Sequence, residues 1–130
     1  MMTLTIATVT LVVDSYDRAL AYYCGVLGLT LVADTPLGGG KRWVVVGGAG
    51  GAQVLLAEAS DAAQLGAIGN QTGGRVGFFM HTDDFAADHV RLLAAGVNFR
   101  EAPRHEAYGT VAVFEDIYGN GWDLIQPRRE

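Results

Sequence analysis

The sequence repeats one pattern of elements after about half its length, and this duplication limits the folds that the chain can adopt. Three pairs match at offsets of 68 or 69 residues: Asp14 with Asp83, Gly28 with Gly96, and the apolar run 43–46 with 111–114. A repeat of this length is too long for a solenoid unit and too short to bury a core of its own. We therefore expect two half-domains that bury their faces jointly.

The first half is expected to fold as a βαβββ module. The threonine- and valine-rich stretch 5–13 is typical of a strand. The apolar residues of 16–27 recur on one helical face. Asp14 or Ser15 can cap the start of this helix, and Gly28 can end it. Further strands are predicted at 29–33, 43–46 and 53–57.

The second half is predicted to follow the same order. A strand at 76–82 leads to Asp83 and Asp84, which can cap a helix that Gly96 ends. The apolar positions of this helix include Phe85, Val90, Leu93 and Ala94. Further strands are predicted at 97–100, 110–114 and 122–125. The fold class is thus α+β, a single domain 1–130 with module one at 1–62, a connecting segment at 63–74 and module two at 75–130.

The composition argues against several classes of function. The 130 residues, 50% hydrophobic and 18% charged, suit one compact globular domain. A net charge of −5 without a basic run disfavours nucleic acid as a partner. No apolar run is long enough for a membrane span, and the first residues lack the basic leader of a secretory signal. The single cysteine, Cys24, excludes an internal disulfide, so we expect a cytoplasmic protein.

Motifs in both halves match those of one superfamily. They are Val9-Thr10-Leu11-Val12-Val13-Asp14 and Asp17-Arg18-Ala19-Leu20-Ala21-Tyr22-Tyr23 in the first half, and Tyr108-Gly109 and Asp116-Ile117-Tyr118-Gly119-Asn120 in the second. Together they resemble the vicinal oxygen chelate superfamily of glyoxalases, extradiol dioxygenases, and fosfomycin- and bleomycin-resistance proteins. The resemblance implies two βαβββ modules whose eight strands curl as mixed sheets around a cavity. It also implies a homodimer in which each cavity combines the first module of one chain with the second module of the other.

Metal-dependent members of that superfamily hold their ion at four positions, usually occupied by histidine and glutamate. The resemblance places these positions at Thr8, Leu55, Gly77 and Asp123. Only Asp123 is a strong ligand, and one carboxylate with one hydroxyl does not hold a divalent ion. We therefore predict no metal site and no cofactor.

Three histidines remain as candidates for acid–base chemistry. His89 is expected on a solvated helix face. His81, at a strand end, either lines the cavity rim or lies at the surface beside Asp83. His105 is expected in a loop before Tyr108, where it is either simply exposed or able to transfer a proton near neutral pH.

Strand alternation predicts which side chains line the cavity. Thr8 and Thr10 are expected to face it, since the aliphatic residues between them suit the helix-covered side. Arg42 and Trp43 begin a strand, and one of the two is expected to point inward. The residues predicted for the ligand pocket are Thr8, Thr10, Arg42, Trp43, Gln53, Leu55, Gln71, His81, Tyr108 and Asp123.

Asp123 is the residue on which the functional hypotheses depend. A buried carboxylate needs partners, and Thr8, Gln71 or Arg42 are candidates. Asp123 either anchors a ligand or makes a structural hydrogen bond at the end of the barrel.

Three functions follow from this pattern. The first is a metal-free small-molecule binding protein of the glyoxalase/bleomycin-resistance type, for which an acidic chain would suit a cationic ligand. The second is a glyoxalase-like lyase or isomerase with Asp123 and His105 as catalytic residues. The third is a metal-dependent lyase or dioxygenase whose ligands are displaced in the alignment. The expected partners are a small-molecule ligand and a second copy of the chain, with no nucleic acid and no membrane.

Overall fold

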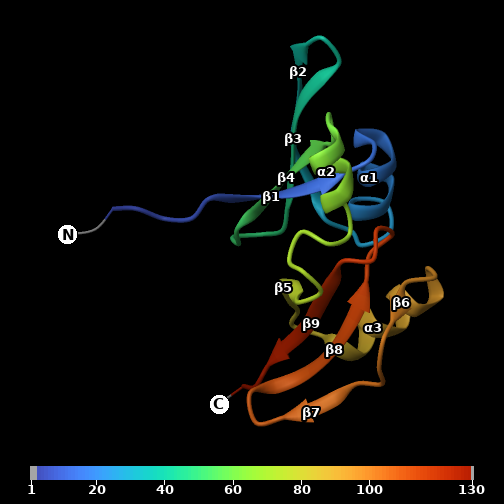
Figure 1. Ribbon diagram of the computed structural model, residues 1–130. Coiled ribbons are helices and arrows are strands. Elements are labelled where there is room, and N and C mark those ends of the chain that lie inside the picture. The colour runs from blue at the N-terminus through green and yellow to red at the C-terminus, as the bar shows by residue number, and fades with distance from the viewer. Residues whose placement is uncertain (1–2, 130) are drawn as a thin grey trace. The chain divides into compact units, whose positions relative to one another are not determined.

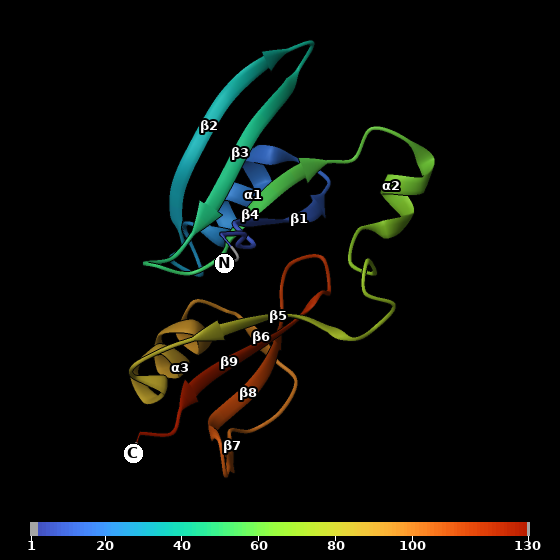
Figure 2. The same ribbon diagram turned by 90° about the vertical axis from the view of Figure 1, so that its left-hand side faces the viewer.

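A computed structural model of the chain describes residues 3–129, which form two compact units that divide between Ile68 and Gly69 (Figure 1, Figure 2). The first unit contains β1 (Thr8–Val13), α1 (Tyr16–Tyr23), β2 (Thr30–Gly38), β3 (Lys41–Gly47), β4 (Gln53–Glu58) and α2 (Ala62–Ala67). The second contains β5 (Val76–His81), α3 (Phe85–Ala94), β6 (Asn98–Phe99), β7 (Arg104–Glu106), β8 (Gly109–Glu115) and β9 (Gly121–Pro127). Among residues 3–129 no helix has the length and apolar character that crossing a bilayer requires.

The first unit is a four-stranded sheet with the strand order β1-β4-β3-β2. β1 runs parallel to β4, while the pairs β3–β4 and β2–β3 are antiparallel. Helix α1 packs on one face of the sheet and covers fully buried residues such as Leu11, Val44 and Leu56. The other face is left to form the candidate site.

The second unit repeats this plan. Its sheet has the order β5-β9-β8-β6, with the short β7 also pairing with β8. β5 is parallel to β9, and β8 is antiparallel to it. Phe114 and Trp122 stack at 5.9 Å between ring centroids, and Phe78 stacks on Trp122 at 4.5 Å. These rings form the core of the second unit with Leu92 of α3, which is fully buried.

The expected α+β architecture is confirmed, and the cap of α1 is Ser15 rather than Asp14, because the Ser15 side chain accepts from Arg18 N. Two elements were not predicted. Helix α2 lies in the segment expected to be a connection, and β7 lies where a loop was expected to hold His105. Both elements are short, with six and three residues, so neither is long enough for an apolar repeat to be recognised in the sequence.

The apolar residues of α3 do not all lie on its buried face, and the expected position of His89 is wrong. Val90 and Leu93 are 67% and 49% exposed, whereas Phe85 and Leu92 are buried. His89 does not lie on a solvated face, since its ring stacks on Phe85 at 5.3 Å. Phe85, His89 and Leu92 follow one another at spacings of four and three, and this is the face that α3 turns to its sheet.

Candidate functional site

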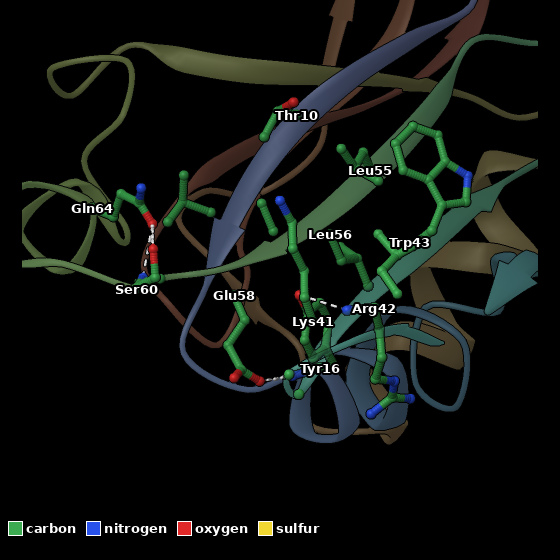
Figure 3. Close-up of a pocket in the computed structure, with 16 residues that line it drawn as sticks. Thr10, Tyr16, Lys41, Arg42, Trp43, Leu55, Leu56, Glu58, Ser60 and Gln64 are labelled. Atoms are coloured by element: carbon green, nitrogen blue, oxygen red, sulfur yellow. Dashed lines mark hydrogen bonds between the residues drawn. The ribbon is translucent and has the colours of Figure 1, made fainter. Parts of the chain in front are cut away.

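A pocket of about 790 Å³ lies on the first unit (Figure 3). Its lining residues come from all four strands, the β2–β3 hairpin and the start of α2: Thr10, Val12, Tyr16, Leu37, Gly39, Gly40, Lys41, Arg42, Trp43, Leu55, Leu56, Ala57, Glu58, Ala59, Ser60 and Gln64. The floor of the pocket is the sheet face opposite α1.

Alternation along β3 decides which of its side chains face the pocket. Lys41, Trp43 and Val45 share one side of the strand. Val45 pairs with Leu55 of β4, and Leu55 pairs with Thr10 of β1, so these residues form a row across the sheet. Trp43 is 46% exposed although it is a large aromatic side chain. An exposed indole over an apolar floor is a surface on which a flat ligand can stack.

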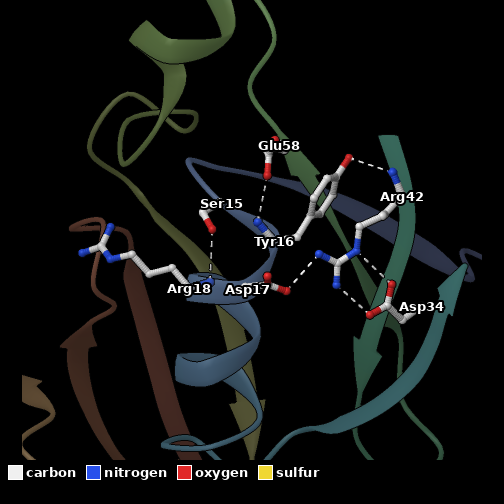
Figure 4. A network of polar contacts seen from close by, with 7 residues as sticks. All are labelled: Ser15, Tyr16, Asp17, Arg18, Asp34, Arg42 and Glu58. Carbon is white, nitrogen blue, oxygen red and sulfur yellow. Dashed lines mark hydrogen bonds and ion pairs between the residues drawn. The ribbon is translucent and has the colours of Figure 1, made fainter. Parts of the chain in front are cut away.

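Arg42 turns the other way and joins three elements (Figure 4). Its Nε and Nη2 donate to the two carboxylate oxygens of Asp34 at 3.1 and 2.7 Å, and its Nη1 donates to Asp17 at 2.9 Å. The guanidinium carbon lies 5.0 Å from the centre of the Tyr16 ring. Hydrogen bonding from Arg42 lowers the pKa of the Asp34 carboxyl. Both Arg42 and Trp43 line the pocket. The Arg42 guanidinium is committed to Asp34 and Asp17, whereas Trp43 shares the strand side of Lys41 and Val45.

The rim of the pocket is polar. Ser60 donates its backbone N–H and its hydroxyl to Oε1 of Gln64, at 2.7 and 3.0 Å. Asp61 caps α2 by accepting from Gln64 N at 2.8 Å. Glu58 accepts from Tyr16 N at 3.0 Å, at the positive end of α1. These bonds hold the Gln64 amide in place at the edge of the pocket.

The second unit places Asp123 in the middle of its sheet. Asp123 pairs with Phe79 of β5 and Val113 of β8. Its Oδ1 is buried and has no hydrogen-bond partner among the described residues. Burial raises the pKa of this carboxyl; the positive charge of Arg104 opposes the rise, and the negative charge of Glu101 adds to it. Asp123 is therefore a buried carboxyl whose protonated form is favoured relative to that of an exposed aspartate.

Arg104 does not neutralise Asp123, because Glu101 already engages it. Nε and Nη2 of Arg104 donate to the two Glu101 oxygens at 2.8 and 3.2 Å. Glu101 also accepts from Val113 N at 2.9 Å. Arg104 lowers the pKa of the Glu101 carboxyl through this hydrogen bond.

His105 and Asp123 are not brought together. Val113 of β8 pairs with Asp123, so their side chains share one face of the sheet. Side chains alternate along β8, so Thr110 points to the opposite face. His105 pairs instead with Thr110, with its Nδ1 3.3 Å from the Thr110 hydroxyl oxygen. The two candidate catalytic side chains therefore belong to opposite faces of the sheet.

The predicted pocket residues divide between the two units. Thr10, Arg42, Trp43 and Leu55 line the first unit's pocket, and the paired Thr8 and Gln53 lie on the same sheet face one row further along. In the second unit, Gln71 lies in an exposed turn and His81 is exposed at the end of β5. Tyr108 lines a separate pocket of about 670 Å³ with Ala107, Arg128 and Arg129.

Sequence reasoning missed Lys41 and Gln64 as lining residues. Lys41 lies two residues before the strand predicted at 43–46, and the structure extends that strand to include it, which puts Lys41 on the same face as Trp43. No sequence signal pointed to Gln64, because helix α2, on which it lies, was not predicted.

The four positions that bind metal in the metal-dependent proteins do not fit an ion here. Thr8 and Leu55 belong to the first unit, and Gly77 and Asp123 to the second. Leu55 and Gly77 carry no ligating side-chain atom. A Cβ added at Gly77 would lie 2.8 Å from Cγ2 of the Thr72 side chain, which would have to shift. Within residues 3–129 no three His, Cys, Asp or Glu side chains gather in a group able to hold a metal ion.

Comparison with known proteins agrees with the fold. Residues 5–124 match the family model described as Glyoxalase/Bleomycin resistance protein/Dioxygenase superfamily. An uncharacterized protein of Shewanella frigidimarina (strain NCIMB 400) is 48% identical over 125 residues, which span 94% of this chain and 93% of that protein. The crystal structure of TnmS3, an antibiotic binding protein from Streptomyces sp. CB03234, is 28% identical with a TM-score of 0.79, covering 98% of this chain and 100% of that one. The crystal structure of UcmS2 is also 28% identical, with a TM-score of 0.81, covering 95% and 98%. On the family match and the 48% identical relative, the chain belongs to the glyoxalase/bleomycin resistance protein/dioxygenase superfamily.

Proposed function

We propose that the protein is a metal-free binding protein that holds a small molecule against Trp43 and releases it unchanged. The observation that carries the proposal is the pocket on the face opposite α1, with an indole 46% exposed above an apolar floor. A volume of about 790 Å³ lies within the range of small-molecule sites. The likeness to TnmS3, whose description is an antibiotic binding protein, supports the same class of function.

The test is binding with Trp43 replaced. Native mass spectrometry of freshly purified protein identifies small molecules that accompany it, and calorimetry measures their affinity for the wild type, Trp43→Leu and Trp43→Phe. We expect Trp43→Leu to weaken binding at least tenfold and Trp43→Phe to retain most of it, because a phenyl ring keeps part of the stacking surface. Equal affinity for all three proteins would refute the proposed site.

A second candidate is a glyoxalase-like lyase or isomerase that uses Asp123. The observation in its favour is the raised pKa of the Asp123 carboxyl, whose Oδ1 is buried and unpartnered. Incubation of the protein with its co-purified small molecule separates the two functions: recovery of unchanged compound supports binding, whereas conversion that Asp123→Asn abolishes supports catalysis.

We also propose that the protein is a cytoplasmic homodimer. Each unit has a sheet face that bears exposed aromatic side chains, Trp43 in the first and Phe79, 62% exposed, in the second. Exposed apolar surface and open sheet edges favour pairing with a second copy. Light scattering at micromolar concentration that reports a mass of 13.8 kDa, that of one chain, would contradict the dimer.

A further inference from the structure

Lys41 is the only lysine of the chain, and it lines the pocket on the side of β3 that carries Trp43. In Figure 3 its side chain extends toward Thr10. Within residues 3–129 its ammonium group takes part in none of the ion pairs. A cation beside an aromatic surface, with no carboxylate committed to it, is an unused binding element.

The carboxylates near this end of the sheet are engaged on its other side. Asp34 and Asp17 bind the guanidinium of Arg42. Glu58 accepts the first N–H of α1 and pairs with Val13, on the helix-covered face. Arg42 and Glu58 also line the pocket, but Arg42 is held in two ion pairs and Glu58 accepts from Tyr16 N. Lys41 is the charged lining residue that none of these contacts engages, although the protein as a whole carries a charge of −5.

We propose that the pocket selects an anionic aromatic ligand, whose fused or linked rings stack on Trp43 and whose carboxylate or phenolate pairs with Lys41. This inference rests on the proposed binding function and specifies its ligand class. Residues i and i+2 of a strand lie about 7 Å apart, so an acidic group at the edge of a ring system can meet Lys41 while the rings cover the indole. The charge-assisted hydrogen bond from an ammonium to a carboxylate gives such a ligand an advantage over its neutral analogue.

The negative net charge does not cancel this preference. At physiological ionic strength charges more than about 8 Å apart are largely screened, so the distant carboxylates of the chain oppose an anion in the pocket only weakly. The net charge slows the approach of anions, whereas the contact with Lys41 determines how long they stay.

Matched probes test the inference. The anions are 2-naphthoate and biphenyl-4-carboxylate, and the neutral controls are the corresponding amides, which have nearly the same shape. Affinity is measured by calorimetry for the wild type, Lys41→Gln, Lys41→Arg and the charge-matched control Arg75→Gln, an exposed position of the second unit. We expect the anions to bind the wild type about tenfold more tightly than the amides, with that preference lost in Lys41→Gln and kept in the other two variants.

The outcomes of these measurements distinguish the anionic ligand class from the binding function itself. Equal binding of anions and amides, both weakened by Trp43→Leu, would overturn the anionic ligand class and leave the binding function standing. Binding of neither kind of probe to the wild type would overturn both.

Chemical labelling gives an independent readout that does not depend on a variant. Because Lys41 is the only lysine, acylation by acetic anhydride followed by peptide mapping reports on it alone, with the N-terminal amine as internal reference. We expect saturating 2-naphthoate to slow the acylation of Lys41 at least fivefold, about the effect of a ligand that occupies most of the sites, and to leave the N-terminal amine unchanged. Equal labelling with and without 2-naphthoate would overturn the contact with Lys41.

Discussion

At the scale of single residues, the second unit contrasts two aspartates. The Asp116 carboxylate is 6% exposed and accepts from the backbone N–H of Tyr118 and Asn120, from Asn120 Nδ2 and from Trp122 Nε1. Asp123, seven residues later, keeps a buried oxygen without a partner. Asp116 therefore builds the turn before β9, whereas the buried oxygen of Asp123 has no such structural role among the described residues.

Asp116→Ala should destabilise the fold strongly. The substitution leaves the buried indole N–H of Trp122 and the amide of Asn120 without their acceptor, which costs about 3 kcal/mol of the free energy of unfolding. Urea unfolding followed by tryptophan fluorescence measures the loss. Asp83→Ala is the control, because Asp83 is exposed and should change stability by no more than about 0.5 kcal/mol.

Asp123→Asn should stabilise the protein at neutral pH while weakening any ligand that the carboxylate holds. The pKa of Asp123 is raised in the folded state, so the folded state binds more protons than the unfolded one, and stability is lost as pH rises through the folded pKa. The side-chain amide of the variant stays neutral at every pH, so the variant avoids this loss of stability. The melting temperature of Asp123→Asn should exceed that of the wild type by about 2–4 °C near pH 7.5, and the difference should vanish near pH 4. A melting temperature that falls at neutral pH would show that the carboxylate is structural.

The sequence predicted residues at the site wherever alternation alone decides a direction. Thr10 and Leu55 were expected on one sheet face, and both line the pocket of the first unit. Alternation did not choose between Arg42 and Trp43, because the choice depends on Asp17 and Asp34, which other elements supply.

At the scale of elements, the sequence predicted those with strong end signals. Ser15 and Asp84 cap α1 and α3, and Gly96, with φ of 86° in the left-handed region, directly follows Ala95, the C-cap of α3. Helix α1 ends earlier than expected, at Tyr23 with Cys24 as its C-cap, so Gly28 lies beyond the helix and not at its end. β2 extends to Gly38 although Asp34 and the following residues are poor strand formers, since pairing with β3 and the Arg42 ion pair hold that edge strand in place. Tertiary partners, which are not visible in local sequence, decide such boundaries.

Arg42→Met should loosen the β2–β3 hairpin without removing the packing of the side-chain stem. The variant loses the ion pairs that join β3 to β2 and α1. The Asp34 carboxyl then loses the hydrogen bond that lowers its pKa, so that pKa should return toward its ordinary value, as NMR titration can measure. Amide exchange in 30–47 should quicken and the melting temperature should fall by a few degrees.

Arg18→Met is the matched control for that variant. Arg18 pairs with Asp14 at 2.7 Å, but both side chains are largely solvated, and such pairs contribute little. Equal rates of amide exchange in 30–47 for Arg42→Met and Arg18→Met would contradict the role of Arg42 in holding the hairpin.

At the scale of the whole molecule, the duplication read from the sequence corresponds to two units with the same topology. In each, the first strand lies parallel to the last, β1 to β4 and β5 to β9, with a helix between the first two strands. The matching helix-capping residues and glycines of the two halves predicted this order of elements. The chemistry of the units does not repeat: the first holds a pocket with an aromatic wall, and the second holds an isolated carboxylate.

The protein as purified should carry no stoichiometric divalent ion, because neither unit supplies a ligand set. Tight binding of zinc, nickel or manganese needs several imidazoles or carboxylates within about 2.0–2.3 Å of one ion. His89 is stacked among aromatic rings, His105 approaches Thr110, and Asp116 is committed to its turn.

Differential scanning fluorimetry and elemental analysis test this. Each ion in excess should raise the melting temperature by no more than about 1–2 °C, since an ion without affinity for the native state cannot stabilise it. Prior treatment with a chelator should leave the affinity for the proposed small-molecule ligand unchanged, because the contacts proposed for it lie on the first unit's strands and need no metal. Close to one ion per chain, with a stabilisation that Asp123→Asn abolishes, would refute the metal-free proposal and favour a metal-dependent lyase or dioxygenase whose ligands lie outside the aligned positions.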